Sequence, residues 1–143
     1  MLPWFLVASC TVAVACGGST DPTPPAPSYL LSQINDVPLP YDHEGLGCCT
    51  YLSGDLTFDG TKYAMSVTAR NRNTGEVFTP REWGSWVGRG SSITFTRDSF
   101  LIIGFSLDVA TVSGDSLRVN FGDEGPGSPG QFHALFLRSE RLE

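Results

Sequence analysis

The stretch that decides the fold is "TYLSGDLTFDGTKYAMSVTARN", residues 50–71. Two runs of alternating apolar and polar residues flank Asp59-Gly60, and Asp-Gly is a strong signal for a tight two-residue β-turn, which needs a positive φ. The apolar face of the first run consists of Leu52, Gly54, Leu56 and Phe58. That of the second run consists of Tyr63, Met65, Val67 and Ala69. The stretch therefore predicts a β-hairpin with one buried and one solvated face.

The same alternation recurs along the rest of the chain from about residue 28, with Gly, Asn, Asp and Pro between the runs. Further strands are predicted at 28–35, 76–87, 92–98, 100–112, 116–121 and 131–138. In the run 100–112 the odd-numbered residues Ile103, Phe105, Leu107 and Val109 form the apolar face. The sequence therefore predicts an all-β protein, an antiparallel up-and-down meander of about eight strands that forms a closed or partly open barrel.

Composition and charge limit the partners. The 143 residues allow one domain of ordinary size. The formal net charge is -6, from 9 basic and 15 acidic residues. Because nucleic-acid binding needs a basic patch, we expect no nucleic-acid partner.

The N-terminal stretch "MLPWFLVASCTVAVAC" carries no charge and is almost wholly apolar. It is shorter than the ~20 residues of a transmembrane helix, and it has the length of a signal-peptide apolar region. The small residues at 13–15 lead into Cys16, and the polar run "GGSTDPTPPAPS" follows as a tether. This arrangement resembles the lipobox of bacterial lipoproteins, which implies cleavage before Cys16 and acylation of its sulfur. A second match, "VASC", ends at Cys10, but cleavage there would leave an apolar overhang.

The chain therefore divides into a lipoprotein signal peptide (1–15), a flexible tether (16–27) and a barrel domain (28–143). Within the domain, Gly84-Ser85-Trp86, "SSITF", "VSGDSLRV" and a last strand ending at Arg138 resemble small lipocalin-like domains of secreted bacterial lipoproteins. The resemblance implies a barrel with an apolar interior and no particular ligand. The faces opposite the apolar ones carry Lys62, Arg70, Asp108, Arg118 and Asn120, so we expect a soluble, tethered domain and not a transmembrane barrel.

Reactive side chains are densest in "YDHEGLGCCT", residues 41–50. Thiolate and imidazole are zinc ligands, which makes His43, Cys48 and Cys49 weak metal candidates, but their spacing matches no structural zinc motif. In an exported chain with a lipidated Cys16, the thiols of Cys48 and Cys49 are the two that remain. We favour a vicinal disulfide or a buried thiol pair over redox sensing and over metal binding.

Four aromatic residues are candidates for lining a ligand cavity: Tyr63, Phe78, Trp83 and Trp86. Aromatic residues fill small barrels in any case, and core packing is the favoured interpretation. Asp123 and Glu124 lie in a Gly- and Pro-rich run without the acidic spacing of a calcium loop. His133 has no acid–base partner nearby in the sequence, and no nucleophile elbow occurs. We therefore predict no catalytic residue, no enzymatic activity and no cofactor.

The sequence thus predicts a non-enzymatic, lipid-anchored envelope lipoprotein, held in the membrane by acyl chains on Cys16. Gly17 after the lipid site favours the outer membrane, with the domain in the periplasm or on the cell surface. The expected function is ligand binding, of a small apolar molecule inside the barrel or of a protein or glycan at its rim. The alternative is a structural or inhibitor-type interaction module whose barrel interior is fully packed.

Overall fold

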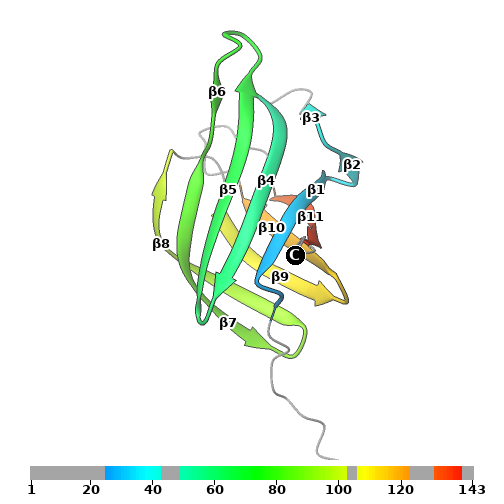
Figure 1. The fold of residues 1–143 in the computed structure, drawn as a ribbon, viewed down its shortest axis with the longest axis vertical. Coiled ribbons are helices and arrows are strands. Elements are labelled where there is room, and N and C mark those ends of the chain that lie inside the picture. The colour runs from blue at the N-terminus through cyan, green and yellow to red at the C-terminus, as the bar shows by residue number, and fades with distance from the viewer. Residues whose placement is uncertain (1–24, 43–48, 103–105, 123–130, 140–143) are drawn as a thin grey trace, which may run out of the picture.

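The computed structural model describes residues 25–42, 49–102, 106–122 and 131–139. All regular structure in these residues is β (Figure 1), and none of them belongs to a helix long and apolar enough to cross a membrane. The strands are β1 (Ser28–Ile34), β2 (Val37–Pro38), β3 (Tyr41–Asp42), β4 (Cys49–Asp59), β5 (Lys62–Asn71), β6 (Val77–Phe78), β7 (Arg81–Arg89), β8 (Ser92–Leu101), β9 (Ser106–Ser113), β10 (Ser116–Gly122) and β11 (Gln131–Arg138).

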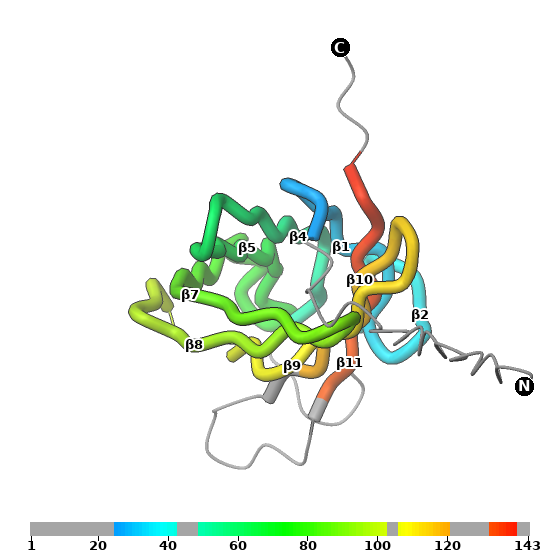
Figure 2. Tube along the Cα trace, turned by 90° about the horizontal axis from the view of Figure 1, so that it is seen from below, coloured from blue at the N-terminus to red at the C-terminus, as the bar shows by residue number. Residues whose placement is uncertain are grey.

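Eight long strands form a closed antiparallel barrel, as the sequence predicts. Their order around the wall is β1-β11-β10-β9-β8-β7-β5-β4, and β4 pairs with β1 to close the ring. Figure 2 shows β7, β8 and β9 following one another round the wall, with β1 and β11 on the other side. Three short strands pair with long ones: β2 with β1, β3 with β4, and β6 with β5. Closure gives each long strand two neighbours and thus removes exposed sheet edges.

The β4–β5 hairpin confirms the prediction from residues 50–71, with two changes: a bulge leaves Leu52 unpaired and places Tyr51 opposite Ala69, and the turn is shifted. Asp59 pairs with Lys62, so the two turn residues are Gly60 and Thr61, one position later than predicted. Gly60 has a φ of 55°, a conformation that glycine adopts without steric cost at the first position of such a turn. The predicted inward set on β5 is buried, with exposed fractions of 4% or less for Tyr63, Met65, Val67 and Ala69.

The two ends of the barrel differ in their connections. At one end, here called the hairpin end, two-residue turns join β4 to β5, β7 to β8 and β9 to β10. At the opposite end, the loop end, longer connections join the remaining long strands of the barrel. Both ends of the described domain lie at the hairpin end, where the Ser139 N–H donates to the Ser28 carbonyl at 3.0 Å.

The inward side chains of the described residues form one packed cluster. Near the hairpin end the cluster is aromatic. Phe58 packs edge-on against Tyr29 and Trp86, with ring centroids 6.0 and 5.6 Å apart. Tyr63 meets Phe95 at 4.9 Å. Such edge-to-face pairs add to the stabilisation from apolar burial.

The run 100–112 does not form the single strand that the sequence predicts. β8 ends at Leu101 and β9 begins at Ser106, and Ile103 and Phe105 lie outside the described residues. Within β9, Leu107 and Ala110 are buried, whereas Val109 is only partly buried, so its predicted inward position is wrong. On β10, Asn120 pairs with Val109 and Phe121 with Leu107, which leaves Asp108 as a bulge. A bulge adds one residue to a strand and therefore shifts the alternation by one.

Candidate functional site

The wall formed by β5 and β7 carries polar side chains on both of its faces. Met65 pairs with Glu82 and points into the barrel, while Ala64 pairs with Trp83 and points outward. Successive residues of a strand face opposite sides, so the two groups belong to different environments. We describe first the inner cluster (Tyr63, Glu82 and Arg97) and then the outer hollow (Asp55, Ala64, Ser66, Arg81 and Trp83).

The inner cluster surrounds a buried carboxylate. Glu82 is 1% exposed, and its Oε1 accepts hydrogen bonds from the Tyr63 hydroxyl at 2.6 Å and from the Leu107 N–H at 3.2 Å. Its Oε2 lies 3.9 Å from the Arg97 guanidinium. A buried carboxylate requires such partners, because its desolvation is costly. Burial raises the pKa of Tyr63 above its ordinary value, and the hydrogen bond to Glu82 and the charge of Glu82 raise it further.

The inner cluster lies where two strands of the wall separate. β8 pairs with β9 only through Ser92–Thr94, although β8 continues to Leu101. Beyond that point the Leu107 N–H of β9 donates to Glu82 of β7. Arg97 lies over the Phe100 ring at 4.9 Å, in cation–π geometry. The Glu82 carboxylate thus supplies an acceptor for the Leu107 N–H at the place where the β8–β9 ladder ends.

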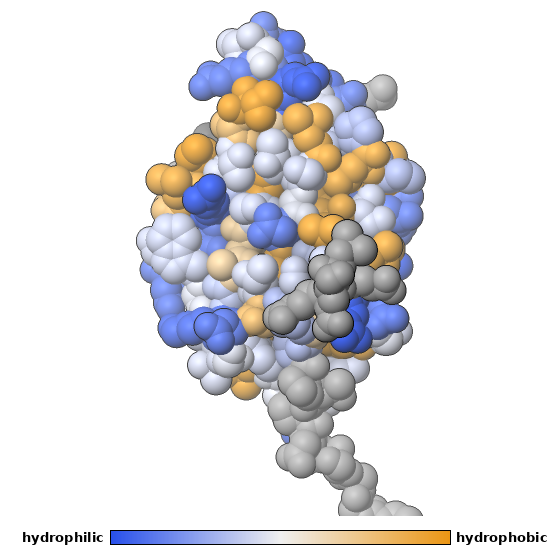
Figure 3. Space-filling view, in the orientation of Figure 1, coloured by the Kyte–Doolittle hydropathy of each residue, from blue (hydrophilic) through white to orange (hydrophobic). Residues whose placement is uncertain are grey.

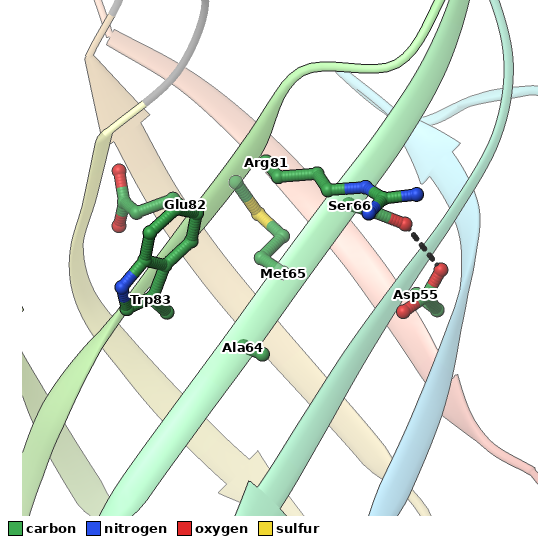
Figure 4. Close-up of a pocket in the computed structure, with 7 residues that line it drawn as sticks. All are labelled: Asp55, Ala64, Met65, Ser66, Arg81, Glu82 and Trp83. Atoms are coloured by element: carbon green, nitrogen blue, oxygen red, sulfur yellow. Dashed lines mark hydrogen bonds between the residues drawn. The ribbon is translucent and has the colours of Figure 1, made fainter. Parts of the chain in front are cut away.

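The outer hollow lies on the outside of the same wall and spans three strands. It has a volume of about 330 Å³ and is lined by residues of β4, β5 and β7, which include Met65 and Glu82, whose side chains are buried. Figure 4 shows Trp83 on one side of Ala64, and the Arg81 side chain extending over Ser66 toward Asp55 on the other. The register explains the grouping, since Asp55 pairs with Ser66 and Ser66 with Arg81. The small side chain of Ala64, between Thr57 and Trp83, leaves space for the hollow.

The outer hollow contains both hydrogen-bond donors and an acceptor. The Ser66 hydroxyl donates to Asp55 Oδ1 at 2.5 Å and so orients that carboxylate. Neither the Arg81 guanidinium nor the Trp83 indole N–H is hydrogen-bonded within the described part of the chain. Trp83 is 42% exposed. The hollow therefore combines hydrogen-bond donors, an acceptor and an aromatic side chain.

The four predicted cavity residues do not gather around one space. Tyr63 lies in the core, and Trp83 lies on the opposite face of the wall. Trp86 packs on Phe58, and its indole N–H donates to the Gly60 carbonyl at 3.0 Å. Phe78 is partly buried on β6. Tyr63 belongs to the inner cluster, whereas Trp83 lines the outer hollow.

Sequence reasoning missed Asp55, Arg81 and Glu82. The alternation in "REWGSWV" indicates that Glu82 and its two neighbours lie on opposite faces of β7. It does not indicate that the face with the glutamate points inward. Asp55 and Arg81 come together only through the pairing of β4, β5 and β7.

The cysteine-rich stretch is described only in part. Cys49 is 3% exposed and disulfide-bonded at the start of β4. Cys48 and His43 lie outside the described residues, as do Cys16, Asp123 and Glu124. The vicinal disulfide of Cys48 and Cys49 thus stays a prediction. Within the described ranges, no three His, Cys, Asp or Glu residues form a group that could hold a metal ion.

His133 has an acid–base partner that is remote in the sequence. Its Nε2 lies 3.0 Å from Asp36 Oδ2, and the Arg118 guanidinium lies 3.4 Å from the other oxygen of that carboxylate. The hydrogen bond to His133 lowers the pKa of Asp36, desolvation opposes this effect, and the charges of His133 and Arg118 lower the pKa further. The Asn35 side chain also accepts from the His133 N–H at 3.2 Å. These contacts hold the β1–β2 turn against β11 on an exposed surface.

Comparison with known proteins assigns this chain to no family. No family model matches it, and no curated protein matches it significantly. A barrel fold hosts many functions, so the functional argument must come from the geometry of the sites.

Proposed function

We propose that this chain is a lipid-anchored protein of the bacterial cell envelope whose barrel binds a ligand without catalysing a reaction. The outer hollow carries this proposal, because Arg81 and Trp83 present hydrogen-bond donors beside a concave space of about 330 Å³. The lipobox ending at Cys16 supports the anchor.

The position of the chain entry supports an orientation for the anchored domain. The described chain enters the barrel at the hairpin end. Residues 16–27 can extend over roughly 40 Å, at ~3.3–3.6 Å per residue. With acyl chains on Cys16, this tether would attach the domain to the membrane at its hairpin end, opposite the loop end. The outer hollow, on the side of the barrel, would remain accessible.

A second candidate is a protein-interaction module. It is favoured by two apolar side chains on the outer surface, Leu30 and Leu137, which are 53% and 45% exposed. They pair directly across β1 and β11. Exposed apolar neighbours of this kind occur at protein interfaces, although two leucines make a small patch.

The anchor is tested by mass spectrometry of membrane fractions from a bacterial host that expresses the full chain. We expect a lipid-modified N-terminal peptide that begins at Cys16. Cys16→Ser should abolish lipidation and membrane association, whereas the matched variant Cys10→Ser should retain both. A Cys16→Ser chain that is still processed and membrane-bound would refute the anchor.

The binding function is tested separately by native mass spectrometry of the purified full chain. We expect a non-covalent adduct that is lost on denaturation. A chain that carries no adduct, and that binds neither the apolar probe 1-anilinonaphthalene-8-sulfonate nor any immobilised glycan, would contradict a ligand-binding function.

A further inference from the structure

We infer that the outer hollow is a carbohydrate-binding site that takes one neutral sugar ring of a glycan. The inference rests on the ligand-binding function proposed above and names the class of ligand. Three features of the hollow support it: an aromatic side, a polar side and a suitable size.

The aromatic side of the hollow suits the C–H face of a sugar. The ring face of Trp83 carries the negative end of its quadrupole, which attracts the weakly positive C–H groups of a pyranose. The neighbouring Ala64 presents only a methyl group, so it leaves a ring room beside the indole. A larger side chain at position 64 would occupy this space.

The polar side suits neighbouring hydroxyl groups. The Arg81 guanidinium offers a planar fork of donors, and the Asp55 carboxylate offers acceptors. Two adjacent sugar hydroxyls both donate and accept, so they can serve both groups at once. The hydrogen bond from Ser66 fixes the Asp55 carboxylate at 2.5 Å before any ligand arrives, which reduces the entropy that binding must overcome.

Other ligand classes match the site less well. An anion would gain from Arg81 but would be repelled by Asp55 and by the net charge of -6. A lipid chain would desolvate both charged groups without providing hydrogen bonds. The outer face of β4 and β5 mixes hydrophilic and hydrophobic groups (Figure 3), unlike a continuous apolar patch. The volume of about 330 Å³ lies at the small end of ligand pockets, which run from ~300 Å³, and suits one ring of a longer glycan.

The test is binding of the full chain, in a detergent without a sugar headgroup, to an array of immobilised neutral and anionic oligosaccharides. We expect binding to a subset of neutral glycans. Trp83→Ala and Arg81→Ala should each weaken it by at least about tenfold, as substitutions at binding hot spots do. Ala64→Leu should abolish it by filling the hollow.

Two matched controls lie on the same strand, outside the hollow. Val87 is 72% exposed on β7, and Arg89 ends that strand. Val87→Ala and Arg89→Ala should leave glycan binding within about twofold of the unsubstituted chain. Each variant is checked for an unchanged unfolding midpoint, so that loss of binding is not loss of fold.

The outcomes separate this inference from the proposed function. Glycan binding that survives Trp83→Ala and Arg81→Ala would overturn the outer hollow as the site, while ligand binding itself would stand. Exclusive binding of anionic glycans would overturn the neutral class. If no glycan binds, the inference fails, and the native mass spectrum and the apolar probe decide whether the binding function fails with it.

Discussion

The two faces of the β5–β7 wall use polar side chains in opposite ways. On the inner face, Tyr63 and Glu82 are hydrogen-bonded to each other and shielded from water. On the outer face, Arg81 and Trp83, the two neighbours of Glu82 in the chain, line the hollow, and the Arg81 side chain extends toward Asp55. The residues alternate along the same strands, yet the inner ones complete the fold and the outer ones are open to a ligand. The comparison predicts that inner substitutions cost stability and outer substitutions cost binding.

The largest effect on stability is expected for Glu82→Ala. It removes the acceptor of two hydrogen bonds and the carboxylate that lies 3.9 Å from the Arg97 guanidinium. We expect a loss of about 3 kcal/mol in the free energy of unfolding, measured by chemical denaturation. The matched variant Glu76→Ala, at an exposed position, should change it by less than about 0.5 kcal/mol. Equal effects of the two variants would contradict the role assigned to the inner cluster.

The next largest effect is expected for Gly84→Ala, also on the inner side of β7. A Cβ atom at this position would lie 2.0 Å from the Thr96 carbonyl oxygen of β8, so backbone would have to move. We expect a loss of about 2 kcal/mol by the same denaturation measurement. Ser85→Ala, at the next residue, should have little effect. A Gly84→Ala chain as stable as the unsubstituted one would show that β7 and β8 can separate without cost.

A smaller effect is expected for Tyr63→Phe, which removes one hydroxyl group from the inner cluster. The loss near neutral pH should be about 1 kcal/mol. The pKa of Tyr63 is raised in the folded state. The contribution of its hydroxyl to the free energy of unfolding is therefore complete below the ordinary tyrosine pKa of about 10, and it is lost as the pH rises from there through the pKa of the folded state. The stability difference between the two chains should thus shrink above pH ~10 in a denaturation series. A difference that stays constant to pH ~11 would contradict the raised pKa.

The smallest effects on stability are expected on the outer face. Trp83→Ala and Arg81→Ala remove exposed side chains that are not hydrogen-bonded to the described residues. Each should change the free energy of unfolding by less than about 0.5 kcal/mol in the same assay. A surface residue is expected to contribute ~0.5 kcal/mol or less to the free energy of unfolding. A loss of about 2 kcal/mol or more for either variant would mean that these outer side chains stabilise the fold.

Much of the fold could be predicted from the sequence, because the two-residue period of β-strands is visible in the chain. The hairpin at 50–71 and the inward position of Tyr63 and Met65 follow from alternation alone. The bulge at Asp108 could not be predicted, because it exists only relative to the partner strand β10.

The candidate site could be predicted only in part. Trp83 stood out as an aromatic residue, but its outward direction depends on Glu82 pointing inward. Hydrophobicity alone predicts the reverse. The buried position of Glu82 becomes favourable only through Tyr63, Leu107 and Arg97, which three other strands supply. Asp55 joins Arg81 through strand register, which a single sequence does not specify.

The most direct test of this account compares two tryptophans of β7 in one spectrum. Trp83 borders the outer hollow, whereas the Trp86 indole N–H is hydrogen-bonded to the Gly60 carbonyl. The measurement is a titration of the ¹⁵N-labelled full chain with the best neutral glycan from the array, followed through the indole N–H resonances. We expect the Trp83 resonance to shift to saturation while the Trp86 resonance stays in place. A shift of the Trp86 resonance with an unmoved Trp83 resonance would contradict it.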